Sequence, residues 1–211
     1  MRSKNLLLAL ISFLILSCND QKEEPKPAVP SENDSRQEKD TSAKEDVFII
    51  KNHSAGDFRL GAALPTSLEN YTITREQQVR TTEEGPTEET VFTISEGDDE
   101  ILRILPAIDA NTGESTEDIG ELRITSEKFR TEEGIGVNST LEEFIDAYPD
   151  YKIWYTYVSD MYVVETEELE AQFLLDEGDY VGEMKVNSVM TPLEKEDFKP
   201  GARIVMVRMV E

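Results

Sequence analysis

Residues 139–165 read STLEEFIDAYPDYKIWYTYVSDMYVVE and contain both kinds of secondary structure that we predict for this chain. A short helix is predicted at the start of the stretch, because Ser139 or Thr140 can cap it and glutamates follow three positions later. Pro149 follows the end of this helix. The rest of the stretch changes to a period of two around the turn Ser159-Asp160, which is typical of two paired strands.

The same alternation recurs on both sides of this stretch. Turn sequences such as Gly85-Pro86, Gly97-Asp98-Asp99 and Asn111-Thr112-Gly113 separate the alternating segments. The predicted strands cover residues 47–51, 71–75, 91–95, 100–105, 120–125, 152–158, 161–165, 171–175 and 202–210. Many strands with one convincing helix predict an α+β fold: a β-rich single domain of antiparallel hairpins with one or two short helices.

A faint internal repeat links residues 60–69, LGAALPTSLE, with residues 135–142, IGVNSTLE. Each segment is followed by a tyrosine, Tyr71 or Tyr151, which opens a predicted hairpin. One interpretation is that the domain consists of two halves, each made of a glycine turn, a short helix and a hairpin. The alternative is that two ordinary capped helices enter hairpins without shared ancestry.

Composition divides the chain into three parts. Residues 1–17 are a predicted signal peptide, because basic residues precede an apolar run at residues 6–16 that is too short to span a bilayer comfortably. Residues 18–46 contain prolines and few apolar residues, so we expect a disordered acidic tether behind Cys18. Residues 47–211 show no further shift in composition and carry 36 acidic and 14 basic residues, which predicts one globular domain.

The end of the apolar run, Ile15-Leu16-Ser17-Cys18, resembles the bacterial lipobox, in which a small residue precedes the cleavage point and a cysteine follows it. The resemblance implies a diacylglycerol thioether on Cys18, cleavage before it, and acylation of the new amino terminus by chains such as palmitate. Because two or more acyl chains hold a protein stably on a membrane, we expect a lipid-anchored protein without a transmembrane helix. The alternative is an ordinary secretory signal with an incidental cysteine.

Two further segments resemble parts of bacterial lipoproteins. Residues 19–24, NDQKEE, are similar to the acidic surface-export signal of lipoproteins from the Bacteroidetes, which implies the outer membrane and favours the cell surface over the periplasmic face. A solvated tether is the alternative. Residues 134–140, GIGVNST, resemble the Gly-Ile-Gly-Val-Gly-Ser-Thr segment of uncharacterised Gram-negative envelope lipoproteins, with Asn138 in place of a glycine. Neither signature implies a catalytic residue.

The charge balance excludes one class of partner. The chain has 45 acidic residues, 21 basic residues and a net charge of −24. Nucleic acid is not an expected partner, because a protein that binds phosphates needs a basic face. The charge of −22 within residues 47–211 instead favours basic partners and predicts binding that weakens as salt rises.

Few residues are suited to catalysis. The single cysteine excludes disulfides within the chain and a thiolate zinc site. The single histidine, His53, follows the first predicted strand, and the chain has no Gly-x-Ser-x-Gly motif, so we interpret His53 as a surface-loop residue. Neither standard Gly-rich phosphate loop occurs. Paired carboxylates remain, and they define an alternative function: an envelope hydrolase that uses two carboxylates, with or without calcium.

Residues 109–113, DANTG, begin like a calcium-binding loop. However, Gly113 stands where a third ligand is needed, and Gly120 stands where the bidentate acid belongs. We therefore interpret the segment as an acidic hairpin turn and predict neither a metal nor another cofactor.

The aromatic residues Trp154, Tyr155, Tyr157 and Tyr162 are the predicted binding residues. In a strand, Tyr155 and Tyr157 share one face and Trp154 lies on the other. One set fills the core, and the other is predicted to stack on a sugar or pack against a protein, because aromatic rings provide a large contact area. The alternative is that all of these rings fill the core and cover a sheet edge.

These observations predict an outer-membrane lipoprotein that acts as a non-catalytic binding module for a protein or glycan partner. It is not predicted to be an enzyme.

Overall fold

The computed structural model describes residues 48–82, 85–186 and 188–211. The predicted signal peptide, Cys18 and the tether lie outside the described residues. Within the described residues, no helix has the length and apolar composition needed to cross a membrane.

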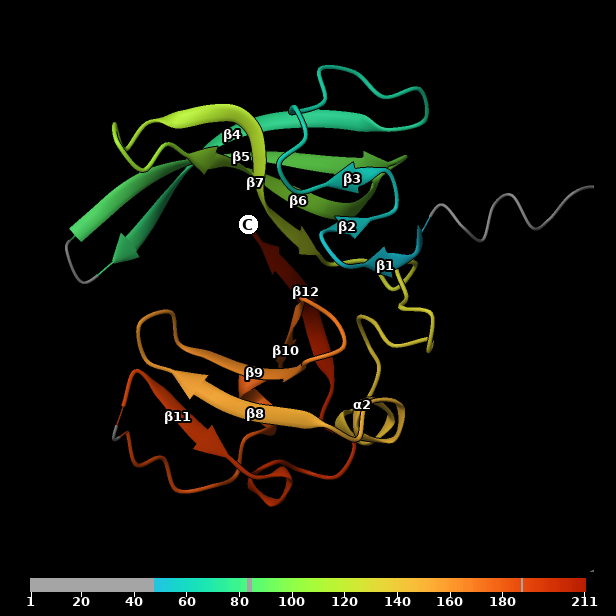
Figure 1. Ribbon diagram of the computed structural model, residues 1–211, viewed down its shortest axis with the longest axis vertical. Coiled ribbons are helices and arrows are strands. Elements are labelled where there is room, and N and C mark those ends of the chain that lie inside the picture. The colour runs from blue at the N-terminus through green and yellow to red at the C-terminus, as the bar shows by residue number, and fades with distance from the viewer. Residues whose placement is uncertain (1–47, 83–84, 187) are drawn as a thin grey trace, which may run out of the picture. The chain divides into compact units, whose positions relative to one another are not determined.

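The described chain is built mainly of antiparallel strands, which confirms the predicted β-rich α+β fold (Figure 1). The early strands are β1 (Ile50–Lys51), β2 (Ser54–Ala55), β3 (Phe58–Arg59), β4 (Thr72–Thr82), β5 (Gly85–Glu96), β6 (Asp99–Ile108) and β7 (Ser115–Ile124). The helix α2 (Leu141–Ala147) precedes β8 (Tyr151–Thr156), β9 (Met161–Thr166), β10 (Gln172–Leu175), β11 (Met190–Leu193) and β12 (Ile204–Val210). Two 3-10 turns, η2 (Glu177–Asp179) and η3 (Lys195–Asp197), complete the elements.

Nine of these strands form one sheet in the order β11-β8-β9-β10-β12-β7-β6-β5-β4. The strand β12 lies in its middle and pairs with both β7 and β10. It thereby joins a half made of β4 to β7 with a half made of β8 to β11 (Figure 1). A separate small sheet of β1, β2 and β3 lies beside the first half.

The predicted helix is confirmed, with Thr140 as its cap. The Thr140 hydroxyl accepts a hydrogen bond from the Glu143 backbone N–H at 3.2 Å, and the Glu143 carboxylate accepts one from the Thr140 backbone N–H at 2.7 Å. This reciprocal pair satisfies donors that the first turn of a helix leaves free. Phe144 then packs its ring 4.9 Å from Phe173 of β10, so the helix covers one face of the sheet.

The proposed division into two halves with one helix each is wrong, because residues 61–70 form no helix. The backbone N–H groups of Gly61 and Leu64 instead donate to the carbonyls of Ile119 and Glu117, at 2.8 and 2.7 Å. Since these donors are bonded to β7, the segment follows that strand and does not coil.

Two strand predictions also need correction. Gly85 and Pro86 lie in β5 rather than in a turn, paired with Thr82 and Thr81 of β4. Only β4 pairs with this end of β5, because β6 pairs with its other end. Pro86 lacks a backbone N–H, but no strand on its other side needs that donor, so proline is tolerated here. The strand β11 was not predicted, because Pro192 stands within it, and it lies at the edge of the sheet, where proline is tolerated.

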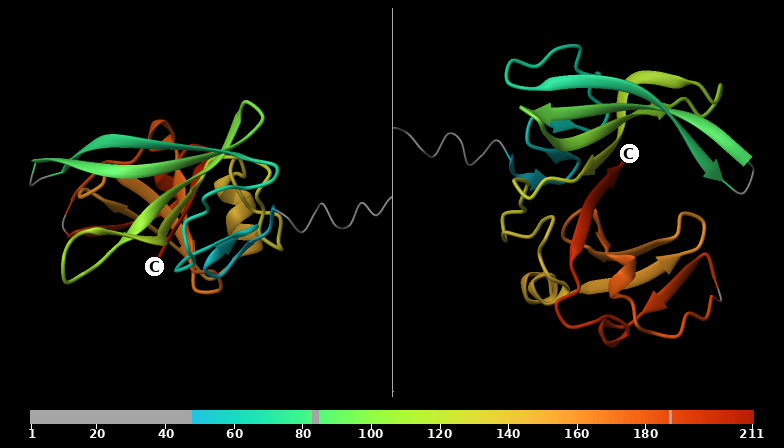
Figure 2. Two further views of the ribbon diagram at one scale, coloured as in Figure 1. Left: turned by 90° about the horizontal axis from the view of Figure 1, so that it is seen from above. Right: turned by 180° about the vertical axis from the view of Figure 1, so that it is seen from behind.

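One face of the sheet carries the hydrophobic core, and we call it the core face. Its fully buried residues come from both halves and from α2. The largest of them are Phe129, Phe144, Phe173, Ile50, Ile94, Ile101, Leu102, Ile104, Leu122, Ile124, Leu141 and Ile204. The opposite side of the same strands, which we call the open face, is turned toward the space between the two halves, and the β4–β5 hairpin extends on that side (Figures 1 and 2).

Candidate functional site

The four predicted aromatic residues do not form one surface. Trp154 and Tyr162 are buried, with 8% and 9% of their surface exposed, and they lie on opposite faces of the sheet. Tyr155 is half-buried against the core face. Only Tyr157, which follows the end of β8, is exposed, at 43%.

Tyr155 and Tyr162 belong to a row of rings on the core face that contact one another in tilted and edge-to-face arrangements. The ring centroids of Tyr155 and Tyr162 lie 4.9 Å apart, and Tyr162 lies 4.9 Å from Tyr180. Tyr180 in turn lies 5.6 Å from Phe198. The Tyr155 hydroxyl donates to Asp160 at 2.8 Å, and this hydrogen bond raises the pKa of Tyr155 to about 12. The row therefore packs β8, β9 and the loops below them.

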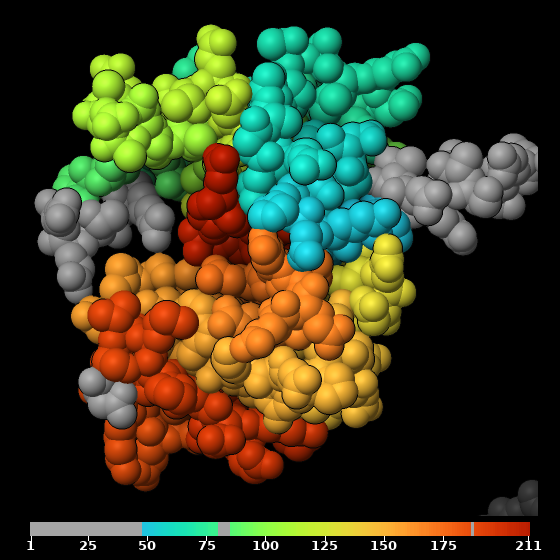
Figure 3. Space-filling view, in the orientation of Figure 1, coloured from blue at the N-terminus to red at the C-terminus, as the bar shows by residue number. Residues whose placement is uncertain are grey.

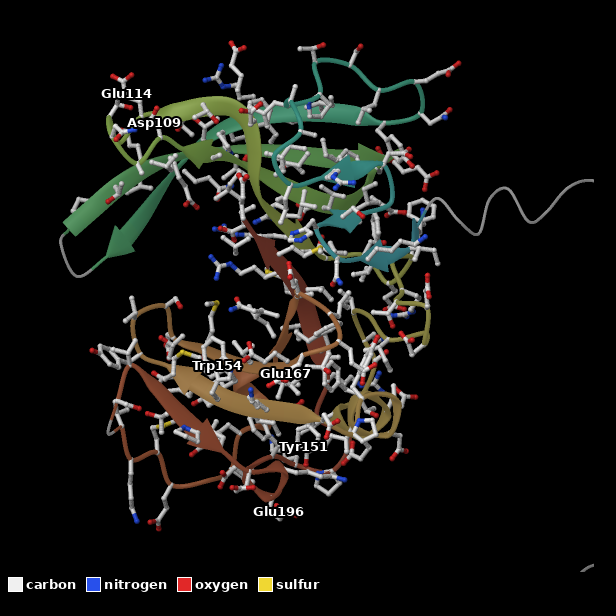
Figure 4. The ribbon with its side chains drawn as sticks, viewed as in Figure 1. Asp109, Glu114, Tyr151, Trp154, Glu167 and Glu196 are labelled. Atoms are coloured by element: carbon white, nitrogen blue, oxygen red, sulfur yellow. The ribbon has the colours of Figure 1, made fainter. Side chains whose placement is uncertain are left out.

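Trp154 lies on the open face, on the side of β8 opposite to Tyr151 (Figure 4). Its cross-strand neighbours are Val163 of β9 and Pro192 of β11. The indole Nε1 is buried and has no hydrogen-bond partner among the described residues. Trp154 thus contributes an apolar floor to the open face rather than an exposed ring.

The open face carries three arginines in direct register. Arg103 of β6 pairs with Arg123 of β7, and Arg123 pairs with Arg208 of β12. Arg208 is followed across the next strand by Gln172 of β10. Like charges at directly opposed positions destabilise a sheet, and the domain has only 14 basic residues against 36 acidic ones. A row of this kind requires compensating groups.

Glu121 of β7 is the main compensating group and the one buried charged residue among those described. One of its oxygens accepts from Nε of Arg123 at 2.7 Å and from Nε of Arg208 at 2.6 Å. The other accepts from Nη2 of Arg208 at 3.1 Å. Burial alone would raise the pKa of Glu121, but these hydrogen bonds and charges outweigh it and hold the pKa below its ordinary value. Glu121 is therefore an ionised structural partner and is unsuited to act as a general acid.

The close approach of β6 and β7 positions Glu121. A Cβ atom at Gly120 would lie only 2.4 Å from Cα of Ala107 on β6, so this position accepts only glycine. The pairing of β6 with β7 also shifts register beside Pro106. The next residue, Glu121, is consequently held against the arginines of the neighbouring strands.

The remaining contacts leave Arg123 incompletely bonded. Nη1 of Arg123 reaches Glu89 of β5 at 3.4 Å, a long contact, and Nη1 of Arg208 donates to Gln172 at 3.2 Å. Arg103 is paired with Glu100, with Nε 2.9 Å from a carboxylate oxygen. Nη2 of Arg123 has no acceptor among the residues that the structure describes.

A groove of about 330 Å³ lies over this row, between the two halves of the sheet. Figure 3 shows the molecular surface hollowed between the two halves, with β12 at the back of the hollow. The apolar side chains that line the groove are Val79, Met161, Leu174 and Met206. Its polar lining consists of Gln78, Glu89, Arg123, Ser159 and Arg208. The groove thus combines two arginines with an apolar floor.

A second groove of about 510 Å³ adjoins the first, and Glu89 lines both. Its apolar lining includes Leu105, Pro106, Ile108 and Val210. No lysine or arginine lines it, whereas several glutamates do. Arg123 and Arg208 therefore line only the first of the two grooves.

The other predicted sites are ordinary loops. His53 is in a turn with a positive φ of 63°, and its Nε2 lies 2.8 Å from a carboxylate oxygen of Glu170, which confirms a surface-loop histidine. Asp109 accepts hydrogen bonds from the backbone of Asn111 and Thr112 at 2.7 and 3.2 Å, which confirms the hairpin turn between β6 and β7. Figure 4 shows Asp109 and Glu114 at the end of this hairpin, on a different half from Trp154. Among the described residues, no group of histidine, cysteine and acidic side chains is arranged to hold a metal.

Glu121, Arg123 and Arg208 were not predicted from the sequence as site residues. A signal for them exists, because each charge stands in an otherwise apolar strand segment, ELRI at residues 121–124 and VMVRMV at residues 205–210. A charge inside such a segment needs a partner of the opposite sign. Their pairing across strands distant in sequence depends on the strand order, which the pattern alone does not contain.

The chain was compared with protein families, curated proteins and solved structures. No family model matches the chain, and no curated protein matches it. A similar solved structure is that of the uncharacterized protein yfeY from Escherichia coli, at 9% sequence identity and a TM-score of 0.46. The similarity covers 77% of this chain and 99% of that chain.

Proposed function

We propose that the protein is an outer-membrane lipoprotein, anchored through Cys18 and facing the cell surface, that acts as a non-catalytic binding module. The observation that supports binding without catalysis is the state of Glu121. It is the one buried carboxylate among the described residues, and two arginines hold it ionised. A hydrolase of the two-carboxylate type needs a desolvated acid that retains its proton near neutral pH. Glu121 has the opposite environment.

The contact surface that we propose is the rim of the groove over the arginines. Val79 of β4 lines the groove and is 68% exposed, and Tyr157 and Val158, which directly precede the groove-lining Ser159, are 43% and 55% exposed. Met190 of β11, which pairs with Thr156, is 50% exposed and adds another exposed apolar side chain at this end of β8. Aromatic and methionine side chains are enriched at protein interfaces, so the rim favours a protein partner over a glycan.

Site-specific photo-cross-linking in the native host tests this proposal. A photoreactive amino acid replaces Tyr157 or Val79 in the full chain, and the matched control carries it at Glu196, which is exposed in η3 on the other side of β8 from Trp154 (Figure 4). We expect a discrete adduct from the two rim positions and none from position 196. A protease-resistant adduct that glycosidases remove identifies a glycan partner instead. Identical adducts from all three positions would contradict the proposed surface.

Anchoring is tested separately with Cys18→Ala. We expect this variant to lose metabolic labelling by a radioactive fatty acid and to leave the membrane fraction, because the acyl chains have no other thiol to attach to. Unchanged labelling would contradict the anchor.

A further inference from the structure

We propose that the groove over Arg123 and Arg208 binds a single-chain amphipathic lipid through its carboxylate head group. This inference goes beyond the proposed partner, since it assigns a small ligand to the interior of the groove rather than a macromolecule to its rim. It rests on three features: an Arg123 guanidinium whose Nη2 has no acceptor among the described residues, a carboxylate of the protein that makes a long contact with the neighbouring Nη1, and an apolar floor beside them.

The head-group position is the outer edge of Arg123. Nε of this residue is bonded to Glu121, whereas Nη2 has no acceptor within the described part of the chain. The side chain is 17% exposed and lines the groove. A guanidinium edge with two parallel N–H donors fits a carboxylate in a bidentate manner. The rest of the domain is strongly acidic, so a cationic edge is a distinctive feature in it.

Glu89 marks where the ligand carboxylate binds. Its Oε1 lies 3.4 Å from Nη1 of Arg123, longer than a charge-assisted hydrogen bond at its optimum. Glu89 is on β5, which the sheet does not pair directly with β7, so the contact depends on its side chain alone. We infer that Glu89 contacts Arg123 when the groove is empty and that the ligand carboxylate takes its place.

The apolar part of the ligand is assigned to the floor beside the arginines. Met161, Leu174 and Met206 come from three neighbouring strands, β9, β10 and β12, and all line the groove. Methionine is flexible and polarizable, so the two methionines of this floor can adapt to a chain without fixed shape. A groove of this size, in which apolar side chains lie beside a small number of placed polar groups, falls in the range of small-molecule sites.

The adjoining groove supports the orientation of the ligand. It is apolar as well, but glutamates and no basic residues line it. An anionic head group is therefore excluded from it by charge and directed to Arg123.

Photoaffinity labelling tests the proposal on the full-length chain in phosphatidylcholine nanodiscs, which avoid detergent in the groove. The probe is a diazirine analogue of palmitate, and its control is the matching diazirine alcohol, which has the same chain and no charge. Peptide mapping by mass spectrometry measures where each probe attaches. We expect concentration-dependent adducts on peptides that contain Met161, Leu174 or Met206 with the acid, and about tenfold weaker labelling with the alcohol.

Four variants make the test decisive. Arg123→Gln is expected to lower the apparent affinity for the acid about tenfold, since it removes a charge-assisted pair. Leu174→Trp fills the floor without changing any charge and is expected to abolish labelling. Glu89→Gln removes the competing carboxylate and is expected to raise the affinity several-fold, a gain that misfolding does not produce. Glu88→Gln, the same change one residue away and outside this groove, is the matched control and is expected to have no effect.

Equal labelling by acid and alcohol would overturn the proposal, because the arginines would then contribute nothing. The proposal would also be overturned by adducts that map outside the groove, or by a Glu89→Gln variant that behaves like Glu88→Gln. None of these results depends on whether the rim binds a macromolecular partner, so this proposal and the proposed function fail independently.

Discussion

Two rows of residues cross the middle of the sheet one position apart, and their side chains differ in polarity, charge and burial. On the core face, Leu102, Ile124, Val207 and Phe173 stand in register across β6, β7, β12 and β10, all of them fully buried. On the open face, the next residues in the same strands are Arg103, Arg123, Arg208 and Gln172. The two rows share their backbone, so the difference between them lies in the side chains alone.

The two rows differ in how much they contribute to the stability of the fold. Burial of the apolar row contributes about 25 cal/mol for each Å² removed from water. The arginine row incurs desolvation and like-charge repulsion, and Glu121 largely offsets these costs without a clear net gain. An apolar row would stabilise the open face at least as well. The charges are therefore better explained by the ligand that we propose for the groove than by the requirements of folding.

The largest expected effect comes from the core face. Phe173→Ala removes a fully buried ring that contacts Phe144, and we expect the free energy of unfolding to fall by about 3–5 kcal/mol. Gln172→Ala, at the neighbouring position on the open face, is the matched control, with an expected loss below about 1 kcal/mol. Chemical denaturation of both variants measures the difference. Equal losses would mean that the two faces contribute alike to stability.

A smaller loss is expected from Glu121→Gln, which leaves Arg123 and Arg208 opposed without a shared carboxylate. We expect about 2–3 kcal/mol, because each charged hydrogen bond contributes roughly 1.5–3 kcal/mol and the amide retains part of it. The triple variant Glu121→Leu, Arg123→Met, Arg208→Met is expected to return to within about 1 kcal/mol of the parent. If the triple variant were the least stable of the three proteins, the cluster would be required for folding.

The open face, unlike the core face, contains a buried ionised group, Glu121, and should therefore make stability depend on pH. The pKa of Glu121 is lower in the folded protein than its ordinary value of 4.5, so its contribution is fully present above that value. It is lost as the pH falls through the folded pKa. We therefore expect the free energy of unfolding to drop more between about pH 7 and pH 3.5 in the parent than in the triple variant, as measured by urea titration. Parallel pH profiles would show that Glu121 does not titrate as proposed.

The smallest expected effect comes from an exposed ion pair. Lys152 and Glu167 are 2.7 Å apart, the same distance as Arg123 and Glu121, but their side chains are 63% and 81% exposed. Lys152→Ala should therefore leave the midpoint of chemical denaturation nearly unchanged, and high salt should erase any difference that remains. A loss as large as that of Glu121→Gln would show that burial does not set the strength of these pairs.

Local features of the fold were predictable from the sequence, and long-range features were not. Thr140 and Glu143 form the predicted capping box, because the motif acts over three residues. The strands around Val163 and Leu122 were predicted from their apolar segments. The insertion of β12 between β7 and β10 was not predicted, since any antiparallel order satisfies a period of two.

The candidate site could not be predicted for the same reason: it depends on the order and register of strands that are distant in sequence. Trp154 and Tyr157 were singled out by residue type, but their exposed fractions, 8% and 43%, depend on how the strands beside β8 are arranged. The arginine row depends on three registers at once, between β6 and β7, β7 and β12, and β12 and β10. A shift of one residue in any of them would move an arginine to the core face.

The central position of β12 also sets the order in which the strands can pair during folding. The strands β7 and β10 are both complete before β12 along the chain, and each has one edge without a partner until β12 binds between them. The pairs of β12 with β7, such as Val207 with Ile124, join residues far apart in the sequence. Closing so long a loop is slow compared with forming the neighbouring hairpins. During that interval the two half-sheets are open to pairing with other chains, so correct folding depends on keeping the free edges of β7 and β10 away from other chains until β12 pairs with them.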